Sequence, residues 1–224
     1  MIVVTIPAYN ESSRIARAIA DAKLYADAVV VIDDCSTDDT RSIAKESGAI
    51  VLHHVINRGQ GAALQTGMEY AVQILNADVI VHFDADGQMR GSDIPAMIQP
   101  IVDGKADVVL GSRFLGAPVR NMPFIRKNLV RLGTLFTIAL SGIRVTDTHN
   151  GFRAFSRHAA STIHISLDRM AHASEILDLI KTHRLRHVEC PVTITYSAET
   201  LYKGQSTVKA LLTAKDILKK KVVG

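Results

Sequence analysis

The chain has 224 residues, of which 47% are hydrophobic, and it carries a formal net charge of +4. That length suits one α/β domain with a substantial core, so two domains of equal size are not expected. The chain has no tryptophan and only 5% aromatic residues. Single-strand nucleic-acid binders need aromatic stacking platforms, so we expect no nucleic-acid partner. Cys35 and Cys190 are too few for a disulfide framework or a zinc site, which predicts free thiols in a cytoplasmic setting.

The N-terminal run MIVVTIPAYNE turns polar at Asn10 and lacks the features of a signal peptide, so we interpret its start as a strand. The most apolar stretch, 132–145, is shorter than the roughly 18 to 20 apolar residues that span a bilayer. No membrane-spanning segment is therefore predicted. The C-terminal run KDILKKK fits either a solvated helix end or a peripheral contact with anionic lipid headgroups.

Short apolar runs alternate with helix-type spacing through the first half of the chain. Strands are predicted at 2–6, 28–32, 49–53, 78–83 and 107–111, and helices at 12–25, 38–47, 61–75 and 92–102. Repeated β-α-β units predict an α/β fold with a mostly parallel sheet covered by helices on both faces. In such a sheet, ligands bind beyond the carboxyl ends of the strands. We therefore place the nucleotide-binding part at about 1–113.

The pattern changes after Arg113. A loop through Pro123 leads into an amphipathic segment at 124–140, followed by a polar turn at THNGFRAF. Further predicted elements are a helix near 174–182, a strand near 188–196 and a helical end from 207. No repeat, low-complexity tract or linker intervenes, so residues 114–224 are expected to extend a single domain, 1–224.

Two aspartates follow the fourth predicted strand in VIVHFDADGQM. Asp84 and Asp86 flank Ala85, so at an extended strand end they point the same way and can hold a divalent cation that bridges phosphates. Gln88 can add a carbonyl oxygen. A solvated turn has the same D-x-D spacing, but the preceding apolar strand and the following Gly87 favour a metal site. An aspartyl phosphatase and an EF-hand both fail on the spacing of the neighbouring residues.

A second acidic cluster lies in VIDDCSTDDT. Asp38 and Asp39 fall at a predicted helix start, where acids favour the helix dipole, and are interpreted as caps. Asp34 follows the second strand, where a carboxylate can accept hydrogen bonds from a base or a ribose.

The loop NRGQGAALQTG fits either a phosphate-binding helix start or a tight turn. It departs from the dinucleotide-binding pattern and follows the third strand, which disfavours a dehydrogenase.

Six ordered motifs together carry a family resemblance: IPAYNE, VIDDCSTDDT, NRGQGAALQTG, FDADGQ, GSR and DTHNGFRAF. With these motifs, nearly the whole chain resembles family 2 glycosyltransferases, within them the dolichyl-phosphate mannose and glucose synthases. The resemblance implies a GT-A fold, a GDP- or UDP-hexose donor, a divalent metal (Mg²⁺ or Mn²⁺) and transfer with inversion at the anomeric carbon.

The resemblance also implies roles for individual residues. Those expected to line the donor or hold the metal and diphosphate are Pro7, Tyr9, Glu11, Asp34, Asp84, Ala85, Asp86 and Gln88. Those expected to supply positive charge to donor and acceptor phosphates are Arg113, Arg126 and Arg153, and Lys203 lies in a segment that resembles a closing loop. The chain departs from the usual pattern at His149 and Asn150, and Glu175 stands alone where an acidic pair is usual.

Three functions follow as alternatives. The first is hexose transfer to a polyprenyl phosphate at the membrane surface, which the arginines and the apolar segment 124–140 favour. The second is transfer to a glycan or small-molecule hydroxyl, which needs a general base such as Glu175 or His149. The third is a nucleotide-sugar-binding module without turnover. A sugar nucleotidyltransferase is disfavoured because PAYNE stands where its Gly-rich loop should be.

Overall fold

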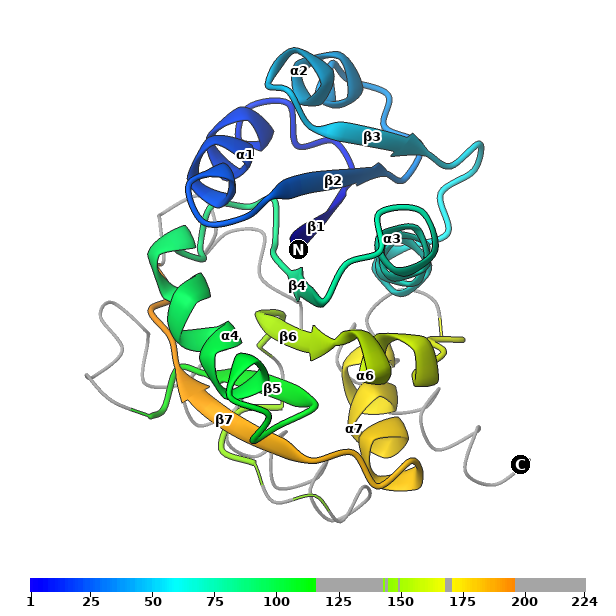
Figure 1. Cartoon of the computed structure of the whole chain (residues 1–224). Coiled ribbons are helices and arrows are strands. Elements are labelled where there is room, and N and C mark those ends of the chain that lie inside the picture. Colours follow the sequence, from blue (N-terminus) through cyan, green and yellow to red (C-terminus); the bar gives the residue numbers. More distant parts are fainter. Residues whose placement is uncertain (116–142, 144, 149, 168–170, 196–224) are drawn as a thin grey trace, which may run out of the picture.

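The computed structural model describes residues 1–115, 143, 145–148, 150–167 and 171–195. A seven-stranded sheet crosses this part of the chain in the order β3-β2-β1-β4-β6-β5-β7 (Figure 1). The strands are β1 (Ile2–Ala8), β2 (Ala28–Asp33), β3 (Ile50–His53), β4 (Val79–His82), β5 (Val108–Ser112), β6 (Arg153–Ser156) and β7 (His187–Pro191). Strands β1 to β4 pair in parallel, which confirms the predicted parallel half of the sheet.

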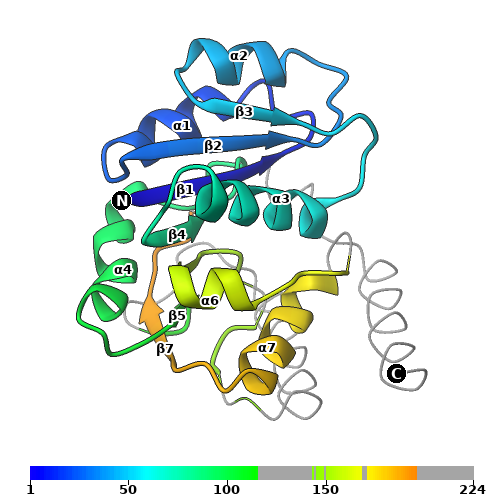
Figure 2. The same cartoon turned by 45° about the vertical axis from the view of Figure 1, so that its right-hand side comes forward.

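Helices cover both faces of the sheet (Figure 2). They are α1 (Ile15–Lys23), α2 (Thr40–Glu46), α3 (Gln60–Gln73), η1 (Gly91–Asp93), α4 (Ile94–Val102), α6 (Arg157–Thr162) and α7 (His172–Thr182). Alternation along the strands divides their side chains between two cores. Val4 and Val31 pack with α1 and α4, whereas Val3 and Ile32 pack with α3 and α7.

Strand β6 corrects the sequence prediction, which interpreted THNGFRAF as a polar turn. Arg153–Ser156 pairs antiparallel with β4 on one side and with β5 on the other, and α6, which was not predicted, follows directly. The four-residue run RAFS has no local pattern that marks a strand, and its hydrogen bonds come from partners distant in sequence. The sheet therefore combines strands from both parts of the chain. Whether 1–224 forms one domain stays a prediction.

The remaining differences lie at element ends or outside the described residues. Strand β7 ends at Pro191, although the prediction extended it to Tyr196, and α1 begins at Ile15 and not at Ser12. The amphipathic segment 124–140 and the predicted helix from 207 lie outside the described residues. Within the described ranges, no helix is both long and apolar enough to cross a bilayer. The cysteines Cys35 and Cys190 are free, as predicted.

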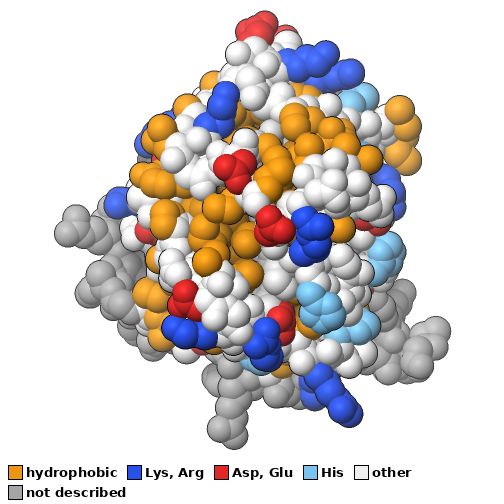
Figure 3. Space-filling view, in the orientation of Figure 1, with side chains coloured by type: hydrophobic (Ala, Val, Ile, Leu, Met, Phe, Trp, Pro, Cys, Tyr) orange, Lys and Arg blue, Asp and Glu red, His pale blue; other side chains and the backbone are white. Residues whose placement is uncertain are grey.

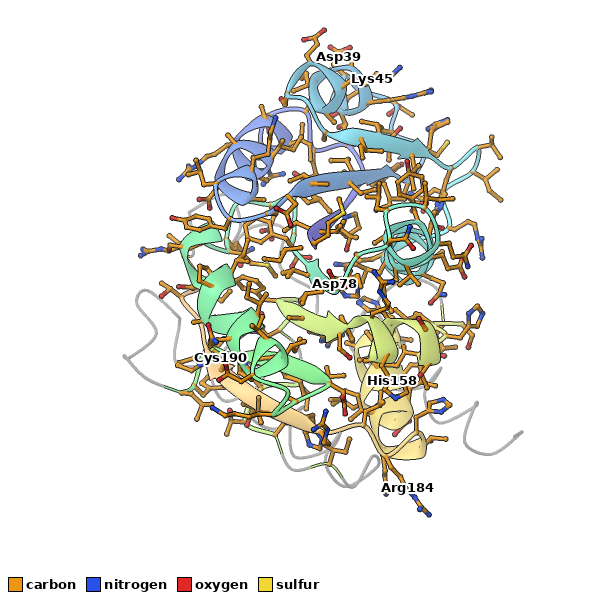
Figure 4. The ribbon with its side chains drawn as sticks, viewed as in Figure 1. Asp39, Lys45, Asp78, His158, Arg184 and Cys190 are labelled. Atoms are coloured by element: carbon orange, nitrogen blue, oxygen red, sulfur yellow. The ribbon has the colours of Figure 1, made fainter. Side chains whose placement is uncertain are left out.

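Charges secure the amino-terminal end of β4. The carboxylate of Asp78 lies 2.5 Å from the terminal amine of Met1 and 3.3 Å from the guanidinium of Arg157 (Figure 4). Charged side chains of both signs are spread over the face of the described residues that Figure 3 shows, and hydrophobic side chains gather near its centre. Asp78 is 68% exposed and lies at the opposite end of β4 from Asp84, so these ion pairs serve the fold.

The burial of β6 gives a stability prediction. Phe155 is fully buried, and its ring lies 4.7 Å from that of His82. Truncation of a buried phenylalanine leaves a cavity, so Phe155→Ala should lower the free energy of unfolding by about 3 to 5 kcal/mol in urea titrations. The control is Val102→Ala, at a residue that is 64% exposed, for which we expect a change of about 0.5 kcal/mol or less. Equal effects of the two substitutions would contradict a buried β6.

Candidate active site

The loops that follow β1 and β2 are joined by hydrogen bonds at the carboxyl edge of the sheet. The backbone N–H of Asn10 donates to Ser36 Oγ at 3.0 Å, and that of Thr37 donates to Asn10 Oδ1 at 2.9 Å. Asn10 and Cys35 adopt positive φ values of 55° and 66°, which turn each loop sharply. Asn10 of the first loop and Ser36 and Thr37 of the second therefore hold the two loops together.

The same two loops correct the prediction that both Asp38 and Asp39 are caps. The carboxylate of Asp38 accepts hydrogen bonds from the N–H of Thr40 at 3.0 Å and from that of Ser12 at 3.1 Å, so this residue joins the helix start to the β1 loop. Asp39 occupies the capping position of α2, but its side chain makes no capping hydrogen bond. Its place on α2 is labelled in Figure 4.

Of the predicted donor residues on the β1 loop, Tyr9 is 48% exposed. Pro7 is half-buried at the end of β1. The N–H of Glu11 donates to Thr40 Oγ1 at 2.8 Å, and its carboxylate lies 2.5 Å from the guanidinium of Arg14. Tyr9 therefore presents an open aromatic ring at this edge, while Glu11 fixes the start of α1.

Two of the three predicted metal ligands, Asp84 and Asp86, are half-buried at the end of β4. Burial and the charge of Asp86 raise the pKa of Asp84 to about 7, whereas Arg153, a hydrogen bond from Gln60 and Arg113 act to lower it. The pair thus combines two like charges in a partly desolvated place. No cluster of three or more His, Cys, Asp or Glu side chains suited to a metal occurs among the described residues, so the chain offers two carboxylates here.

Gln88 lies against Asp86 and holds its carboxylate. The side-chain amide of Gln88 donates to Asp86 Oδ2 at 2.7 Å, and its backbone N–H donates to Oδ1 at 3.0 Å. The Ala85 side chain between the two aspartates is buried. The structure thus brings the three residues of the D-x-D motif together with Gln88, which is bound to a carboxylate. Its service as a metal ligand stays a prediction.

Arg153 is 2% exposed, and its charge acts on Asp84. Its Nη2 donates to the carbonyl oxygens of Thr148 at 3.4 Å and Ala173 at 3.5 Å, and Nη1 has no hydrogen-bond partner among the described residues. Burial lowers the pKa of Arg153 to about 10, and the charges of Asp84 and Asp147 oppose that shift. The guanidinium therefore stays positive and acts on Asp84 through its charge. Its predicted contact with a phosphate stays a prediction.

Arg113 is held by Asp147, which the sequence analysis quoted within a motif but gave no role. Arg113 Nε lies 2.5 Å from Asp147 Oδ2, and Nη2 donates to Oδ1 at 3.2 Å. The Asp147 side chain has no exposed surface, and that of Arg113 is 11% exposed. This bidentate geometry fixes the guanidinium at the end of β5. The one sequence signal for Asp147 is its place in the motif DTHNGFRAF, six residues before Arg153.

Two predicted site residues have their carboxylates engaged by backbone groups. Asp34 accepts hydrogen bonds from the N–H groups of Arg58 at 3.0 Å and Gly59 at 2.6 Å. Glu175, 5% exposed, accepts from the N–H groups of Ser166 and Leu167. In the structure both residues hold loops, so their predicted contacts with substrate stay predictions. Arg126, His149 and Lys203 lie outside the described residues.

A cleft of about 800 Å³ lies beside Asp86, between α1 and the loop that follows β4. Phe83 and Met89 line it together with Arg17 and Arg90. The cleft thus offers apolar surface and positive charge next to the acidic pair.

Comparisons with known proteins identify the family of the chain. The profile described as Glycosyl transferase family 2 matches residues 3–163. A UDP-N-acetylglucosamine–dolichyl-phosphate N-acetylglucosaminyltransferase of Methanococcus voltae is 33% identical over 230 residues, which cover 93% of this chain and 91% of that protein. A dolichol-phosphate mannosyltransferase of Pyrococcus furiosus is 32% identical, with 92% of this chain and 58% of that protein covered.

The fold has solved counterparts. The crystal structure of glucosyl-3-phosphoglycerate synthase from Mycobacterium tuberculosis, in complex with Mn²⁺, UDP and glucosyl-3-phosphoglycerate, superposes with a TM-score of 0.74. The two chains are 20% identical, and the match covers 97% of this chain and 77% of that one. Such a likeness shows the GT-A fold. Because the family profile matches most of its residues, the chain belongs to glycosyl transferase family 2.

Proposed function

We propose that the protein transfers a hexose from a nucleoside-diphosphate sugar to a polyprenyl phosphate, with inversion at the anomeric carbon. The observation that carries this proposal is the acidic pair Asp84 and Asp86 at the end of β4, near Arg113 and the buried Arg153. The relatives from Methanococcus voltae and Pyrococcus furiosus, named for dolichyl- and dolichol-phosphate, support the acceptor class. A lipid acceptor would bring catalysis to a membrane surface, which we expect to be the cytoplasmic face.

The residues present fit a divalent cation. Asp84 and Asp86 bring two negative charges into a partly desolvated site, and the raised pKa of Asp84 shows that this arrangement is unfavourable without added positive charge. Mg²⁺ and Mn²⁺ take oxygen ligands, and a site with one or two carboxylates is commonly completed by substrate phosphates and water. When bound, the cation would supply electrostatic stabilisation of the negative charge on the departing diphosphate.

On the donor side, the chain's own residues would bind and orient. The exposed Tyr9 ring can stack on a nucleoside base, and Asn10 fixes the loop that carries it against the β2 loop. Gln88 keeps the Asp86 carboxylate turned in one direction. Arg113, fixed by Asp147, would add positive charge near the phosphates.

The state of Glu175 favours a phosphate acceptor over a hydroxyl acceptor. A sugar hydroxyl needs a general base, and Glu175 was the described candidate for that role. Its carboxylate instead accepts hydrogen bonds from Ser166 and Leu167 inside the protein. A phosphate monoester, with a second pKa of about 6, is already anionic at neutral pH and needs docking without a strong base. Transfer to a glycan hydroxyl remains the second candidate.

The decisive test combines donor, metal and acceptor with an Asp86→Asn variant. Purified protein, Mn²⁺, a radiolabelled GDP- or UDP-hexose and dolichyl phosphate should give labelled product that extracts into organic solvent. We expect Asp86→Asn to lower this rate by about 100-fold or more, because cation-based charge stabilisation contributes several kcal/mol. Asp39→Asn on α2 is the matched control and should leave the rate unchanged.

The outcomes separate the alternatives. Product found only on a soluble glycan would reject the polyprenyl-phosphate acceptor, and binding of donor without transfer or hydrolysis would favour the non-catalytic module. A thermal-shift panel of GDP- and UDP-sugars, with and without Mg²⁺ or Mn²⁺, would identify the donor, since a ligand that binds the native state raises its apparent stability.

The ion pair of Arg113 and Asp147 gives a second prediction. Removal of one partner from a buried pair leaves an uncompensated charge, so Asp147→Ala should lower the free energy of unfolding by about 3 kcal/mol and also reduce transfer. In Asp103→Ala, the lost partners are the exposed Lys105 and the amide of Gln99, both in exposed contacts, and we expect a change below about 1 kcal/mol. Urea titrations and the transfer assay measure both effects. An Asp147→Ala protein of unchanged activity would show that Arg113 needs no fixed orientation.

A further inference from the structure

Gln60, the first residue of α3, contacts the acidic pair although the family motifs gave it no role. Its side-chain amide nitrogen donates to Asp84 Oδ1 at 3.0 Å. Among the described residues, this is the one side-chain hydrogen bond to the Asp84 carboxylate. The loop NRGQG therefore reaches the end of β4, and neither of its two sequence interpretations, a phosphate loop or a tight turn, anticipated that contact.

The loop is fixed on its first side by Asp34. One carboxylate oxygen accepts the N–H of Arg58 at 3.0 Å and the other accepts that of Gly59 at 2.6 Å. Gly59, at a φ of 90°, takes a conformation that side-chain-bearing residues rarely adopt. His54 in turn lies 2.7 Å from Asp34 and 3.0 Å from Thr66 Oγ1 on α3. Asp34 thus sets the position of the peptide that directly precedes Gln60.

The loop is fixed on its second side by the segment before α7. A Cβ atom at Gly61 would overlap the carbonyl oxygen of Leu167, so the start of α3 and this segment are in direct backbone contact. The N–H of Leu167 donates to Glu175 at 2.8 Å, which holds the segment in place. Gln60 therefore lies between two residues whose backbones are held in place: Gly59, which Asp34 binds, and Gly61, which packs against the segment that Glu175 binds.

The other oxygen of Asp84, Oδ2, lies against the backbone of Gly151. A Cβ atom at Gly151 would lie 2.7 Å from Asp84 Oδ2, so a larger residue at this position would displace the carboxylate. With Gln60 on Oδ1 and Gly151 against Oδ2, rotation of the carboxylate is restricted from both sides. The glycine of NGFR has a physical role here that its motif alone does not reveal.

From this geometry we propose that Gln60 is a positioning residue, which fixes the Asp84 carboxylate for the cation of the proposed function, on which this inference rests. A neutral amide suits the task. It stabilises the ionised carboxylate with a hydrogen bond and adds no positive charge that would repel the cation. Groups that orient metal-binding carboxylates in this way typically change metal affinity by 10- to 100-fold when removed.

The test measures binding of Mn²⁺ alone, by titration calorimetry and by the electron paramagnetic resonance signal of free Mn²⁺. Gln60→Met keeps the length of the side chain and removes the N–H donor. We expect Mn²⁺ to bind about 10-fold or more weakly, with the thermal midpoint within a few degrees of wild type. Gln73→Met, at an exposed position in the last turn of the same helix, is the matched control and should bind Mn²⁺ as wild type does.

A second variant tests whether Asp34 acts through the loop. Asp34→Asn should also weaken Mn²⁺ binding, but should add little in the Gln60→Met background, because both substitutions release the same contact. In the transfer assay, Gln60→Met should raise the Mn²⁺ concentration for half-maximal rate more than it lowers the rate at saturating Mn²⁺. Loss of folded protein would instead lower only the rate.

The outcomes separate this inference from the proposed function. Equal Mn²⁺ affinity in wild type and Gln60→Met overturns the positioning role and leaves the proposed function standing. Failure of the wild type to bind Mn²⁺, both alone and with GDP or UDP present, overturns both. Weaker binding in Gln60→Met and in Gln60→Ala, with Gln73→Met unchanged, supports the inference.

Discussion

Two carboxylates held side by side at the end of a buried strand are the constraint on which the rest of the site depends. Asp84 and Asp86 repel one another, and burial adds to the tendency of Asp84 to take up a proton. Both must stay ionised to serve as cation ligands. The surrounding residues oppose protonation of Asp84 by different means: Arg153 and Arg113 by charge and Gln60 by a hydrogen bond, while Gln88 holds the Asp86 carboxylate in place. The polar groups near β4 are therefore parts of one electrostatic arrangement.

The site is a property of several loops and not of the D-x-D motif alone. The β1 and β2 loops are joined through Asn10 and Asp38, and the β2 and β3 loops are joined through Asp34. Each of these links includes a hydrogen bond between residues at least 24 positions from one another in the sequence. A parallel sheet makes this possible because it delivers successive strand ends to the same edge.

The sequence predicted those features that depend on local pattern. Strands β1, β2 and β4 are continuous apolar runs, and the acids that follow them marked the edge where the site lies. Strand β6 was missed because Arg153–Ser156 gains its partners from β4 and β5 and has no pattern of its own. Many side-chain contacts, like the pairing of β6, depend on residues that are distant in the sequence. That Arg153 is buried, and that Glu175 and Asp34 hold backbone groups, depends on contacts that no spacing in the sequence reveals.

Of the two buried basic residues His82 and Arg153, only Arg153 supplies positive charge near the acidic pair. The ring of His82 is 1% exposed, and neither ring nitrogen has a hydrogen-bond partner among the described residues. Burial lowers the pKa of His82 well below its usual value, and the positive charges of Arg153 and His172 act in the same direction. A neutral histidine adds no charge, whereas Arg153, with a pKa of about 10, remains a cation at neutral pH. The unpaired Nη1 of Arg153 is unfavourable in a dry interior, and a need for fixed positive charge close to two carboxylates would account for that cost; the unpaired nitrogens of His82 have no such role.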